Sequence, residues 1–76
     1  MTYQEANNLL LKLKLEILNK EFKNKNTDET HIVSDISIKE FPPGGGDNFD
    51  VVISMKNPTI VFEGKYEGFS LLYQAK

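Results

Sequence analysis

The chain has 76 residues, no cysteine and no tryptophan, and eleven acidic residues against nine lysines give it a net charge of −2. This length indicates one domain, residues 1–76, in which folding buries roughly 60% of the surface of the unfolded chain. The lack of cysteine excludes disulfide bonds and thiolate zinc sites. The sequence also contains no arginine, which is unusual for a protein that reads DNA sequence, because arginine makes most bidentate contacts to guanine.

The location of the protein is inferred from segments that the sequence lacks. Unbroken apolar runs, such as residues 9–11, do not exceed three residues, far fewer than a membrane-spanning helix requires. The N-terminus has no basic stretch followed by an apolar one, so we predict no signal peptide and a cytoplasmic protein. No motif indicates a cofactor or a small-molecule substrate, and we expect neither.

The first part of the chain reads as one helix. Residues 1–26 carry five lysines and three glutamates, a balance of +2, whereas residues 27–76 carry four lysines and eight acids, a balance of −4. Thr2 and Glu5 have the spacing of a capping box, and we predict that the helix ends near Asn24 or Asn26. Residues 11–17 alternate between apolar and charged and could also form a strand, but strong helix formers favour the helix.

This helix would carry two apolar ridges, roughly 120° apart, because consecutive residues turn by about 100°. The first ridge consists of Tyr3, Ala6, Leu10, Leu13 and Ile17. The second ridge consists of Leu11, Leu15, Leu18 and Phe22. One sheet covers one ridge, so the second ridge needs a curled sheet, the C-terminal segment or another subunit.

The remainder of the chain alternates as strands do. We predict strands at residues 31–39, 49–56 and 60–65, with Ile32, Ile36 and Ile38 on one face of the first of them. Residues 69–75 predict a fourth strand, with a short helix as the alternative. Short connections between successive strands favour an antiparallel meander, so the predicted fold is α+β: an N-terminal helix packed on a three- to four-stranded antiparallel β-meander.

Candidate catalytic and metal-binding residues are few. His31 is the only histidine, and Asp35 follows on the same predicted strand face, but no serine lies in a nucleophile elbow. We therefore expect a solvent-facing histidine, with a hydrolytic role for His31 as a weaker alternative. Asp47, Asn48 and Asp50 do not follow the spacing of a calcium loop. We predict a protein that is not an enzyme and holds no metal.

The interpretation we favour is a small protein-binding or accessory module that associates with itself, by analogy in size with inhibitors, immunity proteins and prophage-encoded factors. Val52 and Leu72 occupy positions of their predicted strands that alternate with the core-facing ones, so they would add apolar area to the outer sheet face. A glycine-rich connection after two prolines could also contact a partner through its bare backbone. The predicted partner-binding residues are Leu11, Leu15, Leu18, Phe22, Gly44, Gly45, Gly46 and Asp47.

Weak, non-specific binding of nucleic acid through the helix lysines is the alternative function. Lys12 and Lys23 lie on the wet face of the predicted helix and could contact phosphates. Glutamates are mixed among these lysines, and the second part of the chain is acidic. We therefore favour a protein partner, including a homodimer, over nucleic acid or a membrane.

Overall fold

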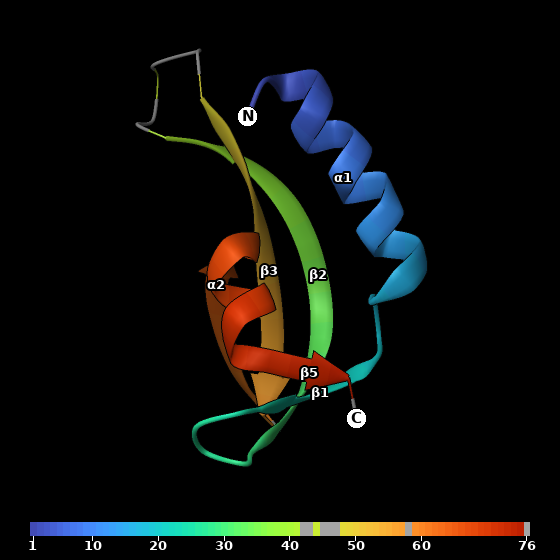
Figure 1. Ribbon diagram of the computed structural model, residues 1–76, viewed down its shortest axis with the longest axis vertical. Coiled ribbons are helices and arrows are strands. Elements are labelled where there is room, and N and C mark those ends of the chain that lie inside the picture. The colour runs from blue at the N-terminus through green and yellow to red at the C-terminus, as the bar shows by residue number, and fades with distance from the viewer. Residues whose placement is uncertain (42–43, 45–47, 58, 76) are drawn as a thin grey trace.

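The computed structural model describes residues 1–41, 44, 48–57 and 59–75, and over these residues the protein has an α+β fold (Figure 1). The sheet is antiparallel with the strand order β4-β3-β2-β1-β5, so it has five strands where three or four were predicted. The elements in chain order are α1 (Tyr3–Glu16), β1 (Glu21–Asn24), β2 (Thr30–Glu40), β3 (Phe49–Asn57), β4 (Ile60–Lys65), α2 (Tyr66–Leu72) and β5 (Tyr73–Ala75).

Helix α1 begins at the predicted capping box. The Glu5 backbone N–H donates to the Thr2 hydroxyl and the Thr2 backbone N–H donates to the Glu5 carboxylate. Hydrogen bonds to the Glu5 carboxylate, first from the Thr2 backbone N–H and second from the Thr2 side chain, lower the pKa of Glu5. Ala6 and Leu13 of the first ridge are buried against the sheet, as the 3.6-residue period predicts.

The predicted end of the helix near Asn24 or Asn26 is wrong, because α1 stops at Glu16. Asn19 then adopts a left-handed backbone conformation with φ 64°, which asparagine tolerates better than most residues. The Asn19 N–H donates to the Val33 carbonyl, and this bond holds the turn against β2. The chain therefore reverses into β1, and Phe22 enters the core from a strand and not from a helix.

A β-bulge between Val33 and Asp35 changes which residues of β2 face the core. Ahead of the bulge His31 and Val33 are buried, and beyond it Ile36 is buried, so one extra residue resets the alternation. Ile32 is consequently 43% exposed and does not share a face with Ile36 as predicted. The strands at 31–39, 49–56 and 60–65 are otherwise confirmed as β2, β3 and β4.

Strand β3 is buried on both faces. Val51, Ile53 and Met55 belong to the core on the helical side of the sheet. Val52 lies on the outer face, yet it is only 4% exposed and does not add the apolar surface that was predicted there. Two ion pairs lie over this outer face, Lys39 with Glu63 at 3.1 Å and Lys65 with Asp50 at 3.4 Å. Lys39, Glu63 and Lys65 surround Val52 on this face.

The C-terminal segment is mainly helical. The predicted strand over residues 69–72 is wrong and the helical alternative is correct there, because α2 spans Tyr66–Leu72 and only residues 73–75 form β5. Strand β5 pairs with β1 and extends the sheet beyond the predicted meander. Both helices contribute to a single core, α1 through Leu13 and α2 through Phe69. Neither described helix has the length and apolar character that crossing a membrane requires.

Candidate functional site

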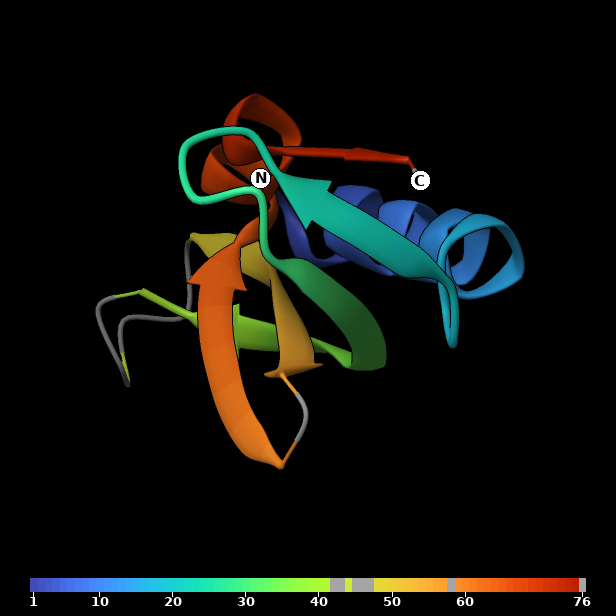
Figure 2. The same ribbon diagram turned by 90° about the horizontal axis from the view of Figure 1, so that it is seen from below.

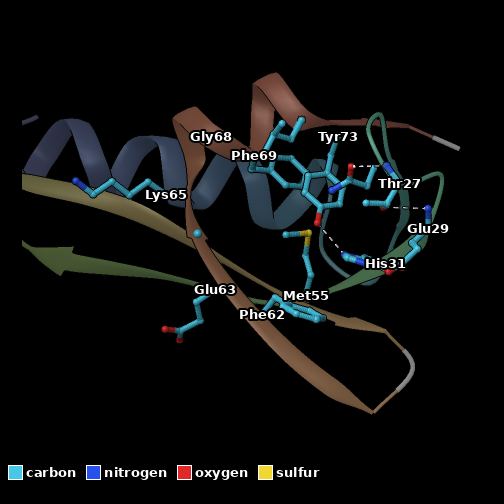
Figure 3. Close-up of a pocket in the computed structure, with 13 residues that line it drawn as sticks. Thr27, Glu29, His31, Met55, Phe62, Glu63, Lys65, Gly68, Phe69 and Tyr73 are labelled. Atoms are coloured by element: carbon cyan, nitrogen blue, oxygen red, sulfur yellow. Dashed lines mark hydrogen bonds and ion pairs between the residues drawn. The ribbon is translucent and has the colours of Figure 1, made fainter.

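The structure forms a pocket of about 390 Å³ between α2 and the strands β3 and β4 (Figure 3). Its walls are mostly apolar and come from distant parts of the chain: Met55, Phe62, Phe69, Leu72 and Tyr73. Polar groups of the β1–β2 connection and the start of β2 close one end, among them Glu29 and His31. A pocket of this size, apolar with a few polar groups, is typical of sites that hold a small ligand or a partner's side chain.

Aromatic rings fix the shape of this pocket. Phe69 and Tyr73 stack with their centroids 5.4 Å apart, and Phe69 also makes an edge contact with Phe22 at 5.1 Å. Across the pocket, the Phe62 ring lies parallel to the His31 ring at 5.4 Å. Such ring pairs contribute about 0.5–1.5 kcal/mol each beyond the area that they bury, so the walls are held by packing between elements.

His31 was predicted to face solvent, but it lies in the core and is 4% exposed. The alternation of side chains along β2 ahead of the bulge places His31 on the core face of the sheet. Its Nδ1 forms a hydrogen bond of 2.8 Å with the Tyr73 hydroxyl, visible as a dashed line in Figure 3. Its Nε2 lies 3.5 Å from the Glu29 carboxylate, which also accepts a hydrogen bond of 2.7 Å from the Asn57 side chain. Both ring nitrogens therefore have partners, as a buried imidazole requires.

The serine and aspartate that might have joined His31 in a hydrolytic site lie elsewhere. Asp35 is exposed, and it lies opposite Ser54 in the strand register beyond the bulge. The prediction that Asp35 shares a strand face with His31 is therefore wrong. The hydroxyls of Ser34 and Ser70 donate to backbone carbonyls. Within the described residues, no histidine, aspartate and glutamate side chains gather in a group of three that could hold a metal ion.

Replacing Tyr73 with phenylalanine tests the buried hydrogen bond. We expect the free energy of unfolding of the Tyr73→Phe variant to be about 1–3 kcal/mol lower than that of the wild type, because Nδ1 of the buried His31 then loses its hydrogen-bond partner. Chemical denaturation measures the difference. Tyr3→Phe is the matched control, since Tyr3 is 57% exposed; equal stability of both variants would contradict this account of the network.

A second feature of the site is the free edge of β4. All six residues of β4 are exposed, and its apolar half is 61% exposed at Ile60, 54% at Val61 and 43% at Phe62. Strand β3 pairs with one side of β4, and no described strand pairs with the other. Figure 2 shows β4, in orange, at one edge of the sheet beside β3. Such an edge presents unpaired N–H and C=O groups to any extended chain.

The predicted partner-binding residues that the structure describes do not form one surface. Leu11 and Leu15 are 55% and 87% exposed on α1, whereas Leu18 is partly buried against the core and Phe22 is within it. Gly44 is exposed with φ +82°, and its N–H donates to the Glu40 carboxylate. The other predicted loop residues, Gly45, Gly46 and Asp47, lie outside the residues that the structure describes.

Several lysines that could have contacted phosphates are paired with acids. Lys12 lies 4.0 Å from Glu16 on α1, and Lys23 lies 3.2 Å from Asp28 beside β1. Lys39 and Lys65 form the ion pairs of the outer sheet face described above. These neighbours weaken the positive field that draws nucleic acid to a surface.

Sequence reasoning missed both the pocket and the edge. The pocket depends on α2, which was an alternative to a strand, and on the bulge that turns His31 inward. The consecutive apolar residues 60–62 could have indicated the edge, because a strand with one face in water usually alternates between apolar and polar residues. This chain matches no protein-family model, no curated protein and no solved structure.

Proposed function

We propose that this protein is a non-enzymatic protein-binding module that offers the edge of β4 to an extended segment of a partner. The observation that carries the proposal is an edge strand whose six residues are all exposed and whose first half is apolar. Proteins usually protect such an edge with short strands, lysine, proline or a covering element. An added strand would satisfy the free backbone groups of β4, which is how β-augmentation binds peptides.

The pocket supports the same proposal because it lies directly beside the edge. Phe62 belongs to β4 and also forms a wall of the pocket, so one residue joins the two features. In Figure 3 the Glu63 and Lys65 side chains point away from the pocket, which leaves its apolar walls open to an entering group. A bound strand would pair along β4 and place an apolar side chain in the pocket. The backbone hydrogen bonds would then supply affinity, and the pocket would supply selectivity for the side chain.

Binding through α1 is less well supported than binding through β4. Leu15 and Leu11 are exposed, but Lys12 and Glu16 lie beside them and form an ion pair across the same stretch of helix. The free backbone of an edge strand adds hydrogen bonds that a helix surface does not offer. We therefore place the recognition surface at β4.

A library of random peptides displayed on phage tests this function. We expect the wild-type chain, immobilised at low density, to select apolar extended peptides. Phe62→Lys should weaken their binding at least about tenfold, because it places a charge on the edge and removes a pocket wall. Leu15→Lys is the matched control and should leave binding unchanged. Failure to select any peptide, or a loss of binding in Leu15→Lys alone, would refute the proposal.

A further inference from the structure

We propose that the strand received by β4 is β4 of a second copy of this chain, paired antiparallel about a two-fold axis at Phe62. This inference rests on the proposed function, since it names the partner of the same edge. It joins the two sheets into one continuous sheet across the axis and places Phe62 of each copy opposite its equivalent. The argument uses the faces, charges and sizes of the β4 side chains.

The two faces of β4 limit the registers that two copies can adopt. Met55 opposes Phe62 and Ile53 opposes Gly64, so Ile60, Phe62 and Gly64 lie on the helical face of the sheet. Residues directly opposite each other in an antiparallel pair share a face. A two-fold axis perpendicular to the sheet must therefore pass midway between the two copies of one β4 residue, and that residue is called the centre of the register. Centring at Phe62 pairs residues 60–64 of both copies, centring at Glu63 pairs residues 61–65, and the other centres pair much less of the strand.

The charged side chains of β4 favour one of these two registers over the other. An axis at Glu63 would bring the Glu63 carboxylates of both copies directly opposite each other, which destabilises a strand pair. It would also place Val61 opposite the Lys65 ammonium of the second copy. An axis at Phe62 instead places Val61 opposite Glu63 and opposes no like charges. Glu63 can keep its ion pair with Lys39, because that pair lies on the outer face.

Side-chain size favours the same register. Centring at Phe62 places Ile60 opposite Gly64 of the second copy. A Cβ on Gly64 would have no heavy atom within 4 Å, so the surface there is open. Ile60 is 61% exposed, and the Ile60 side chain of each copy can fill the open space beside Gly64 of the other copy. The two Phe62 rings would meet at the axis and cover surface that is now 43% exposed.

Sedimentation equilibrium of the wild-type chain and two lysine variants tests the inference. We expect a wild-type dimer. Phe62→Lys should raise the dissociation constant at least about tenfold, because it brings two ammonium groups together at the axis. Val61→Lys, the matched control on the neighbouring residue, should leave the constant equal or lower, because Glu63 of the second copy lies opposite. Weakening by Val61→Lys with no effect of Phe62→Lys would overturn the register.

Cysteine cross-linking gives an independent measure, since the natural chain has no cysteine. In the proposed register, Phe62→Cys places two thiols directly opposite each other, within the Cα separation that a disulfide allows. Glu63→Cys places its two thiols on a diagonal, at roughly 7–8 Å, which is beyond that range. We expect rapid oxidative dimerisation of Phe62→Cys and little of Glu63→Cys; the opposite order would overturn the register.

A wild-type chain that stays monomeric at every concentration would overturn the inference of a second copy. That result is distinguishable from failure of the proposed function, because phage selection on sparsely immobilised chains reports peptide binding without any dimer. A monomer that still selects peptides through β4 would leave the edge as a binding site for another protein. A monomer that selects none would refute both proposals.

Discussion

Replacing Phe22 with alanine should lower the free energy of unfolding by about 3–5 kcal/mol, the usual cost of removing a buried phenylalanine ring. Phe22 is 9% exposed, belongs to the core and contacts the Phe69 ring edge-on at 5.1 Å. In a domain this small, such a loss is a large fraction of the total stability. Urea denaturation followed by circular dichroism would measure it as a lower midpoint.

Leu15→Ala is the matched control for Phe22→Ala. Both residues were assigned to the same predicted ridge, but Leu15 is 87% exposed. We expect its replacement to change the free energy of unfolding by no more than about 0.5 kcal/mol. Equal losses in the two variants would contradict the end of α1 at Glu16, because only a longer helix would put both side chains on one buried stripe.

Replacing Phe69 with alanine should cost about 3–5 kcal/mol as well and should also release α2 from the sheet. Phe69 is the buried residue of α2, and it contacts Phe22, Tyr66 and Tyr73. A seven-residue helix has little stability of its own, so its position depends on this anchor. Amide hydrogen exchange should accelerate across Tyr66–Leu72 before it does so in β3.

Leu71→Ala controls for the effect of changing any residue of α2. Leu71 is 69% exposed, and we expect its replacement to shift stability by no more than about 0.5 kcal/mol and to leave exchange in α2 unchanged. If Phe69→Ala left exchange across α2 as slow as in the wild type, the residue would not be the anchor. The walls of the pocket would then need another explanation.

The features that local chemistry determines were predicted correctly from the sequence. Thr2 and Glu5 form the expected capping box, because that motif requires only residues three apart. The strands β2, β3 and β4 follow from alternating residues bounded by turn signals. The α+β class then follows from one amphipathic helix and consecutive antiparallel strands.

The features that depend on tertiary contacts could not be predicted. Residues 11–17 alternate in a way that suits a helix or a strand, and the turn at Asn19, held to Val33 of β2, follows the early end of the helix. The bulge beside Ser34 has no clear signal in the sequence, yet it decides that His31 is buried. The candidate site combines these unpredicted features, so the sequence-based prediction named the N-terminal helix and residues 44–47 for partner binding and did not include the edge of β4 that we now propose.

Amide hydrogen exchange along β4, measured at low and at high protein concentration, tests the central claim most directly. We expect exchange to slow at alternate residues of β4 as concentration rises, because their outward N–H groups become paired with a second copy. Exchange around Leu11 and Leu15 should stay the same. Protection that grows on α1 and not on β4, or rates that do not change with concentration, would contradict the claim.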